Sequence, residues 1–242
     1  MKSFPSLTLL AVTLAGLPPA AHAFSVLTAG HADIGVGYEA GEFHPHWHLH
    51  EGTFVNGAPL PEEAEFAPDE LLAYVSDPSG ARPPGSTWDF LGTSAGSPLW
   101  VLPAVEDHAR PFIGLASEEL ESADWTSLHL RLVQFAGPAG GHFSLWQTDA
   151  LGNPVVQMAT SNGLDASDRF ELAVGGHHHL NYGFTQPGLY ELTLQWDGQH
   201  VVDGAVSARA TYAFGVTVIP EPRPATLLAL GFLGWLAFAR KR

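Results

Sequence analysis

The sequence predicts an all-β domain, folded as an antiparallel β-sandwich of immunoglobulin-like or jelly-roll-like type between an N-terminal signal helix and a C-terminal transmembrane helix. Three observations predict the sandwich. Several segments alternate apolar and polar residues with period two, which buries one face of an extended strand. The 26 Gly and 19 Pro favour tight turns between such segments. No segment carries the apolar stripe of a helix, and many short strands joined by turns are typical of sandwiches.

The clearest strands are expected in residues 190–196 and 206–218. Large apolar residues alternate with polar ones in residues 190–196, and Asp197-Gly198 then gives a turn signal. This pattern predicts two neighbouring antiparallel strands. One face of the second strand is expected to carry Val206, Ala208, Ala210, Tyr212, Phe214, Val216 and Val218.

The other segments between the ends are shorter or ambiguous. Residues 125–135 and 143–147 predict two further strands, and the Gly- and Pro-rich residues 137–141 link them. Residues 68–75 begin like a helix but fit a strand equally well. The Pro- and Glu-rich residues 56–65 predict an exposed loop.

The first 23 residues have the composition of a secretory signal peptide. Lys2 precedes an apolar run, and small residues close the segment at Ala23, after which cleavage is expected. The alternative is a first buried helix. Gly16 and the Pro18-Pro19 pair oppose it, because they interrupt the segment where a core helix would continue.

The C-terminal segment, residues 220–242, has three ordered parts: Pro220-Glu221-Pro222, the apolar run 225–239, and the basic cluster 240–242. The run is near the shortest helix that crosses a bilayer, and the basic cluster would stay in the cytoplasm. The three parts resemble the PEP-CTERM sorting signal of Gram-negative, exopolysaccharide-producing bacteria. The resemblance implies processing by an exosortase-type enzyme and a location at the cell envelope, the outer surface or the extracellular matrix. An ordinary tail anchor predicts the same topology without cleavage.

Residues 24–219 are long enough for one domain with a substantial core. They hold five Arg, no Lys and 24 acidic residues, which gives a formal charge of −19. This charge repels phosphate backbones and argues against nucleic-acid binding, while it attracts cations. It also serves solubility alone, and that alternative stays open. The absence of Cys excludes disulfides and thiol nucleophiles, so any metal site must use His, Asp and Glu.

Three groups of metal-ligating residues follow an i, i+2 spacing, which places both side chains on one face of a strand. They are His31 with Asp33, His177 with His179, and the row His44, His46, His48 and His50. Two such pairs that meet across a sandwich supply four ligands, a set that suits zinc or another divalent transition metal. The alternative is that these histidines are surface or hydrogen-bonded structural residues.

Several sequence blocks together resemble the choice-of-anchor M, or surface-anchored protein, domain over about residues 26–218. The last block is the most specific, because it combines His-x-His-x-Asn, an aromatic residue, Phe-Thr and then Pro-Gly-x-Tyr. The blocks are residues 30–34, 90–92, 100–103, 137–138 with Phe143, 177–185 and 187–190. Residues 30–34 contain His31 and Asp33, and residues 177–185 contain His177 and His179. These two pairs are expected to meet, because terminal strands of a sandwich commonly neighbour later ones.

The resemblance implies a β-sandwich protein attached to a surface, with a role in relaying a metal to the components of a metal ABC transporter. Two motifs of the family pattern match this sequence: the first at His31 and Asp33, and the second at His177, His179 and Asn181. Asn181 is expected to orient an imidazole from outside the ligand set. The His44–His50 row lies outside the family pattern, and Tyr182 stands where Trp is more usual.

The predicted function is therefore that of an exported, non-enzymatic, surface-anchored binding protein that relays or sequesters a divalent metal. Residues 92–96 match the G-x-S-x-G pattern of hydrolases, but that motif needs a following helix, and none is expected there. Two alternatives remain. Trp47, Trp88 and Trp125 allow an exopolysaccharide-binding module, and a structural protein of the matrix or envelope needs no small ligand.

Overall fold

The computed structural model describes residues 24–219, whose regular elements are strands apart from three short 3₁₀ helices. The predicted all-β class is confirmed. The predicted signal peptide and sorting segment lie outside the described residues. Within residues 24–219, no helix has the length and apolar character that a membrane span requires. The three 3₁₀ helices are η1 (Ser86–Leu91), η2 (Ser122–Asp124) and η3 (Thr160–Asn162).

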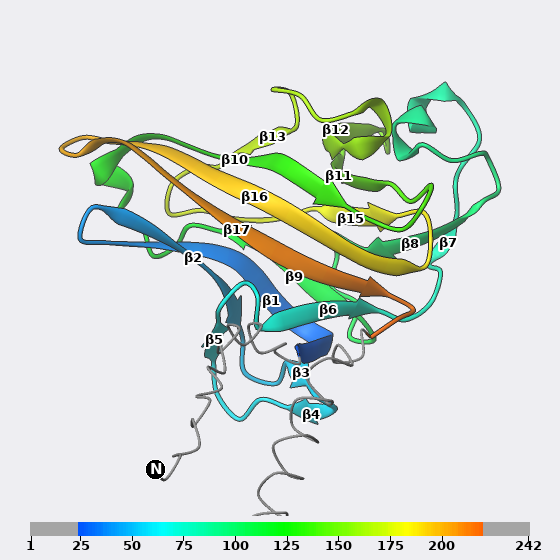
Figure 1. Ribbon diagram of the computed structural model, residues 1–242, viewed down its shortest axis with the longest axis horizontal. Coiled ribbons are helices and arrows are strands. Elements are labelled where there is room, and N and C mark those ends of the chain that lie inside the picture. Colours follow the sequence, from blue (N-terminus) through cyan, green and yellow to red (C-terminus); the bar gives the residue numbers. More distant parts are fainter. Residues whose placement is uncertain (1–23, 220–242) are drawn as a thin grey trace, which may run out of the picture. The chain divides into compact units, whose positions relative to one another are not determined.

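Three long antiparallel strands form the centre of the larger sheet: β10 (Trp125–Ala136), β16 (Gly188–His200) and β17 (Gly204–Val216) (Figure 1). The short β13 (Arg169–Glu171) pairs with the free side of β10. On the other side, β17 pairs in parallel with β6 (Leu71–Val75). The last strand of the domain therefore lies inside the sheet.

The β16–β17 pair confirms the two antiparallel strands expected near the C-terminus. Trp196 lies opposite Ala208 and Tyr190 opposite Phe214. The predicted inward face of the last strand holds as far as Val216. Val218 is exposed instead, because the strand ends where Thr217 adopts a positive φ of 56°. The strands expected at 125–135 and 143–147 are also confirmed.

Strand β1 (Ser25–Glu39) takes part in two parts of the larger sheet. Its first residues pair in parallel with β6. Leu27 and Ala29 also pair with β3 (Phe54–Val55), and β3 in turn pairs antiparallel with β4 (Ala58–Pro59). Its later residues pair with β2 (Glu42–Leu49) on one side and, in parallel, with β9 (Pro111–Ala116) on the other. The second part is completed by β5 (Ala64–Phe66) beside β2 and β14 (His177–His179) beside β9.

A second sheet follows directly from β14, since only Leu180 separates β14 from β15. Its order is β12-β11-β15-β8-β7. The strands are β12 (Pro154–Ala159), β11 (Phe143–Thr148), β15 (Asn181–Phe184), β8 (Pro98–Leu102) and β7 (Gly80–Ala81).

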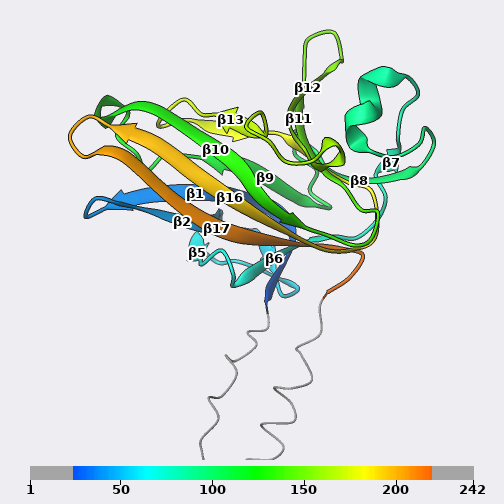
Figure 2. The same ribbon diagram turned by 45° about the horizontal axis from the view of Figure 1, so that its top comes forward.

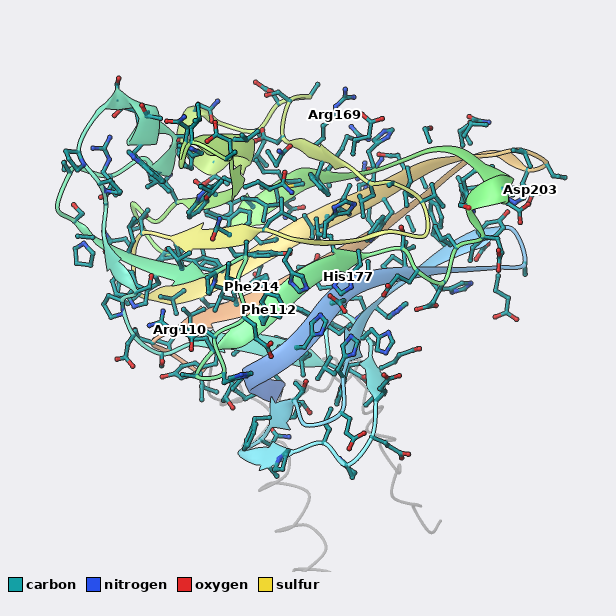
Figure 3. The ribbon with its side chains drawn as sticks, turned by 180° about the vertical axis from the view of Figure 1, so that it is seen from behind. Arg110, Phe112, Arg169, His177, Asp203 and Phe214 are labelled. Atoms are coloured by element: carbon teal, nitrogen blue, oxygen red, sulfur yellow. The ribbon has the colours of Figure 1, made fainter. Side chains whose placement is uncertain are left out.

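Aromatic residues fill the core between β2, β17 and the second sheet. Trp47 of β2 contacts Tyr212 of β17 edge-on with ring centroids 5.2 Å apart, and Phe214 packs against Phe184 of the second sheet at 5.4 Å. Figure 2 shows β1 and β2 running beneath β16 and β17. Figure 3, which views the molecule from behind, labels Phe214. All four rings are fully buried. Burial of a side chain of this kind stabilises the fold by about 1.5–3 kcal/mol.

Three local expectations need correction. The sheets are not purely antiparallel, because β1–β6, β1–β9 and β6–β17 are parallel pairs. Residues 56–65 are not a plain loop, because β4 lies inside this segment and β5 begins at its end. The ambiguous residues 68–75 contain a strand, β6, in which Leu71, Leu72 and Ala73 are all fully buried. A strand that is covered on both faces loses the alternation that would reveal it in a sequence.

Candidate metal centre

The structure brings His31, Asp33, His177 and His179 together around the middle of β9. Asp33 pairs with Gly114 from one side of β9, and His179 pairs with the same glycine from the other side. Side chains two residues apart share a face of a strand, so both ligand pairs project over Gly114. The parallel β1–β9 pair thus joins residues that are distant in the sequence.

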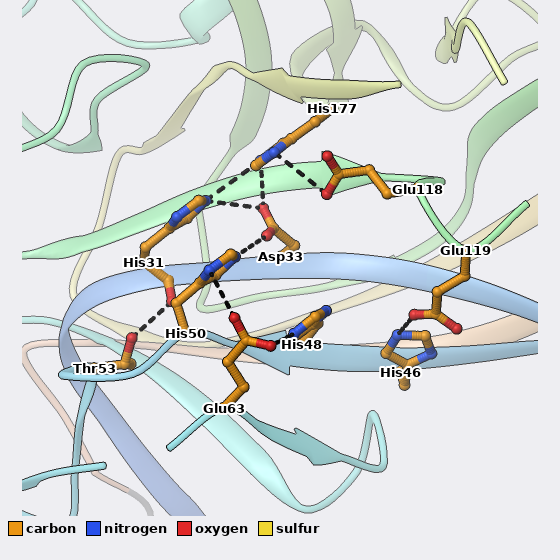
Figure 4. A network of polar contacts seen from close by, with 10 residues as sticks. All are labelled: His31, Asp33, His46, His48, His50, Thr53, Glu63, Glu118, Glu119 and His177. Atoms are coloured by element: carbon orange, nitrogen blue, oxygen red, sulfur yellow. Dashed lines mark hydrogen bonds and ion pairs between the residues drawn. The ribbon is translucent and has the colours of Figure 1, made fainter. Parts of the chain in front are cut away.

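The ligand atoms have the separations of a small coordination sphere (Figure 4). Oδ1 of Asp33 lies 2.8 Å from Nε2 of His177 and 3.4 Å from Nε2 of His31, and the two Nε2 atoms are 3.3 Å apart. One ligand atom from each of the four residues lies within 4.8 Å of all the others. With zinc bonds of about 2.0–2.1 Å, two ligand atoms of a tetrahedron lie about 3.3 Å apart. The observed triangle therefore fits zinc.

The carboxylate of Asp33 is only 1% exposed, yet its Oδ1 accepts no hydrogen bond of acceptable direction. Both neighbouring Nε2 atoms are close enough, but a ring N–H donates only along the ring plane. A buried carboxylate oxygen without a donor is costly, and a coordinated cation satisfies it. The short distances without aligned donors indicate that the groups converge on a shared point.

Gly114 provides the space beneath this point. A Cβ at position 114 would overlap Oδ1 of Asp33 and lie 2.6 Å from Nε2 of His177. Any other residue would displace both groups. Nothing in the local sequence singles out this glycine, since its role depends on the pairing of β9 with β1 and β14.

Two further residues, His50 and Glu118, lie beside the candidate ligands. Nε2 of His50 lies 3.1 Å from Oδ2 of Asp33, and its ring stacks on His31 with centroids 4.0 Å apart. Oε2 of Glu118 lies 3.7 Å from Nδ1 of His177. At this distance Glu118 acts on His177 through its charge rather than through a hydrogen bond. In the sequence, His50 stands out only as a member of the histidine row, and nothing singles out Glu118.

Asn181 does not orient an imidazole, which is the role expected from the sequence. Its Oδ1 accepts a hydrogen bond from the main-chain N–H of Ala104 at 3.0 Å, and its Nδ2 donates to the carbonyl of Trp146 at 3.2 Å. Both groups of the amide therefore contact main chain rather than an imidazole. Asn181 belongs to β15 in the second sheet and holds neighbouring segments together there.

The histidine row divides into separate environments. The segment is extended as β2, and His44, His46 and His48 alternate with residues that face the core. His44 is exposed, while His48 and His50 stack at 5.2 Å and approach the two carboxylate oxygens of Glu63 at 3.6 and 3.8 Å. His46 is buried and lies in a separate cluster with two glutamates.

The surroundings of the centre shift two pKa values downward. Burial, together with repulsion from His177 and His31, lowers the pKa of His179 to about 4. The ring of His179 also stacks on Phe112 at 3.6 Å. Burial alone would raise the pKa of Asp33, but contacts with the three nearby imidazoles outweigh it and hold the pKa below 3.8. At neutral pH the centre thus presents a carboxylate and an uncharged His179 imidazole, both in the protonation state that metals bind.

The metal-free protein is expected to lose stability as the pH falls from about 6.5 towards 4. His179 has a lower pKa in the folded state than the ordinary 6.5, so the unfolded chain binds this proton more readily over that range. The contribution of Asp33 is lost only at more acidic pH, because its pKa lies below 3.8. Thermal unfolding in a chelating buffer between pH 7.5 and 4.5 measures this slope. His179→Gln should flatten it, and an unchanged slope in that variant would contradict the assignment.

An open cleft of about 440 Å³ adjoins the centre. His179 lies on its wall together with Asn181, and the remaining lining comes from Ala104, Val105, Gln147, Thr148, Asp149 and Val155. One edge of the metal-ligating group therefore borders a solvent-accessible hollow between the β8–β9 connection and the second sheet.

Comparisons with known proteins add no assignment to this geometry. The chain matches no family model. A search of the curated proteins finds no match. A search of the solved structures finds none either. The resemblances to a choice-of-anchor M domain and to a PEP-CTERM signal therefore stay predictions from the sequence, and functional inference rests on the residues of the centre.

Proposed function

We propose that this protein binds a divalent transition metal, with zinc as the best fit, through His31, Asp33, His177 and His179. The observation that carries the proposal is the environment of Asp33. Its carboxylate is buried, and its Oδ1 lies within 3.4 Å of two imidazole nitrogens without an aligned donor. Three imidazoles and one carboxylate form a ligand set that suits zinc and other first-row transition metals better than it suits magnesium or calcium.

The number of ligands favours binding over catalysis. Four protein ligands complete a tetrahedral shell, whereas a catalytic zinc keeps a position for water. The formal charge of −19 on residues 24–219 also raises the local concentration of cations around the domain. Both features support relay or sequestration of the metal.

The location and partners of the protein form the wider part of the proposal. A signal peptide in residues 1–23 and a sorting segment in residues 220–242 would place the domain at the envelope or outer surface of a Gram-negative bacterium. An exosortase-type enzyme would process the tail, and components of a metal ABC transporter would exchange the cation. The facing β layers support a sandwich, and the cleft beside His179 gives the centre access to solvent.

The exopolysaccharide-binding alternative has weaker support. Stacking on a sugar needs a flat aromatic side chain that is open to solvent. Of the six tryptophans in residues 24–219, five are buried and Trp88 is partly exposed. Trp47 and Trp125, two of the three considered for this role, lie in the core. A purely structural role is the other alternative, and a metal analysis separates it from the proposed one.

Metal analysis of the full chain, purified without a polyhistidine tag, tests the proposal. We expect one equivalent of zinc at this centre and a rise in thermal stability on zinc addition. At a free zinc concentration of 100 times Kd, the free energy of unfolding should rise by about 2.7 kcal/mol. The double variant His177→Ala/His179→Ala should lose this equivalent and the stabilisation that comes from it, because it removes two of the four ligands.

His108→Ala is the matched control, because the side chain of His108 is 88% exposed and lies outside the centre. It should retain the zinc content and the stabilisation of the unmodified protein. Equal zinc content in the unmodified protein and the double variant would contradict the proposal. Zinc-independent stability together with retention on an exopolysaccharide resin would support the sugar-binding alternative.

A further inference from the structure

A second group of metal-ligating residues lies on the outer face of β2, apart from the first centre. It consists of His46 on β2, Glu65 on β5 and Glu119 just after β9. One ligand atom from each residue lies within 4.8 Å of the other two. We propose that these three residues form a second binding site for a divalent transition metal. This proposal shares no ligand with the first centre and does not depend on it.

The hydrogen bonding of His46 determines which nitrogen carries its proton. Nδ1 lies 3.0 Å from the carbonyl oxygen of His44. A carbonyl oxygen only accepts hydrogen bonds, so Nδ1 must be the donor. In a neutral imidazole, Nε2 then carries a lone pair. It is the Nε2 atom that faces Glu119, at 2.8 Å from Oε1.

This contact brings an imidazole lone pair against an ionised carboxylate, which also only accepts hydrogen bonds. The two atoms need either a shared proton or a cation between them. The direction of the ring argues for the cation: Nε2 is buried and makes no hydrogen bond of acceptable geometry, although Oε1 is close. His46 as a whole is only 9% exposed, so solvent does not satisfy this nitrogen. Figure 4 shows the His46–Glu119 pair to one side of the first centre.

Two glycines of β1 make room for the pair. Gly35 lies opposite His46 in the β1–β2 pairing, and a Cβ there would stand 2.7 Å from Nε2 of His46. A Cβ on Gly37 would stand 2.8 Å from Oε2 of Glu119. The two positions follow Asp33 on the same face of β1. The bare backbone at both positions is what allows the imidazole and the carboxylate to lie over the strand.

The two sites are close neighbours along β1. Asp33 and Gly35 are two residues apart, which is about 7 Å along a strand. The second site differs in its donors, since it has one nitrogen and two carboxylates instead of three nitrogens and one. Its carboxylates are exposed, and the side chain of Glu119 is 45% exposed. Three protein ligands and an open side leave room for water, so we expect weaker and more readily exchanged binding than at the first centre.

Calorimetric zinc titration of the full chain tests the second site through its stoichiometry. The unmodified protein should bind two equivalents, the weaker of which disappears in Glu65→Gln/Glu119→Gln. The variant His177→Ala/His179→Ala should instead lose the tighter one. Combining all four substitutions should remove both. Each pair of substitutions removes only its own equivalent, so failure of one site is distinguishable from failure of the other.

Glu62→Gln is the control, because Glu62 is an exposed carboxylate of the neighbouring loop, and its variant should bind two equivalents. Circular dichroism establishes that each variant is folded, and the exposed glutamates tolerate amides without loss of packing. A full complement of zinc in Glu65→Gln/Glu119→Gln would overturn the proposal. So would a single equivalent in the unmodified protein that Glu65→Gln/Glu119→Gln leaves unchanged, since His46 and Glu119 would then form only a protonated ion pair.

Discussion

Gly114→Ala is expected to weaken zinc binding at the first centre by at least about 100-fold, which corresponds to about 2.7 kcal/mol. The added methyl group would overlap Oδ1 of Asp33 and stand 2.6 Å from Nε2 of His177. Neither ligand can then occupy its place in the coordination sphere. The effect arises without changing any ligand, so it tests the convergence of the four residues over β9. Isothermal titration of the full chain with zinc measures it.

Gly80→Ala is the control for this substitution. Gly80 also lies in a strand, but nothing stands within 4 Å of a Cβ placed there. Its variant should bind zinc like the unmodified protein. Thermal unfolding in a chelating buffer separates loss of binding from loss of folding in Gly114→Ala. Undiminished affinity in a folded Gly114→Ala variant would show that the cation does not bind above this glycine.

Asp33→Asn is expected to reduce zinc affinity by a similar factor while preserving the shape of the side chain. The amide removes the only negative charge among the four ligands and places an NH₂ group or a weakly donating oxygen at the metal. It also removes a stabilising charge from the metal-free protein. The pKa of Asp33 is held below 3.8, so its contribution is present above that pH and is lost as the pH falls through its folded-state value.

Zinc titration and pH-dependent unfolding together check this prediction. At pH 7 the metal-free variant should be less stable than the unmodified protein, and the difference should disappear in strong acid. Asp77→Asn, at an exposed position, should change neither property. Equal zinc affinity in the two proteins would mean that Asp33 is a structural carboxylate held by imidazolium groups rather than a ligand.

The strands were predictable where one face of the strand is buried and the other is exposed to solvent. In β16 and β17 the alternation is local, so it is readable without knowledge of neighbouring strands. The same argument placed the histidines of β2 on one face. The direction of pairing has no such local signal, because a period of two is identical in parallel and antiparallel strands. The parallel pairs of β1 were therefore missed.

The candidate site was predictable only as far as its paired ligands. His31, Asp33, His177 and His179 stand out by spacing. Gly114 and Glu118 acquire their places only from the pairing of β9 with β1 and β14, which are distant in the sequence. Asn181 illustrates the opposite error. It continues the i, i+2 series in sequence, but β14 ends at His179, and β15 pairs with different strands.

The interior position of the final strand has a consequence for the order in which the molecule assembles. His31 and His177 are 146 residues apart, and β17 separates β16 from β6 in the sheet that β1 joins. A nascent chain that has emerged only as far as β16 lacks the strand that connects β6 to the rest of this layer. Closing such distant segments is slow because the loop entropy is lost before the contacts form. The four residues of the candidate centre converge only when β1, β9 and β14 have paired, so a cation at this point would depend on contacts between segments that are distant in the sequence.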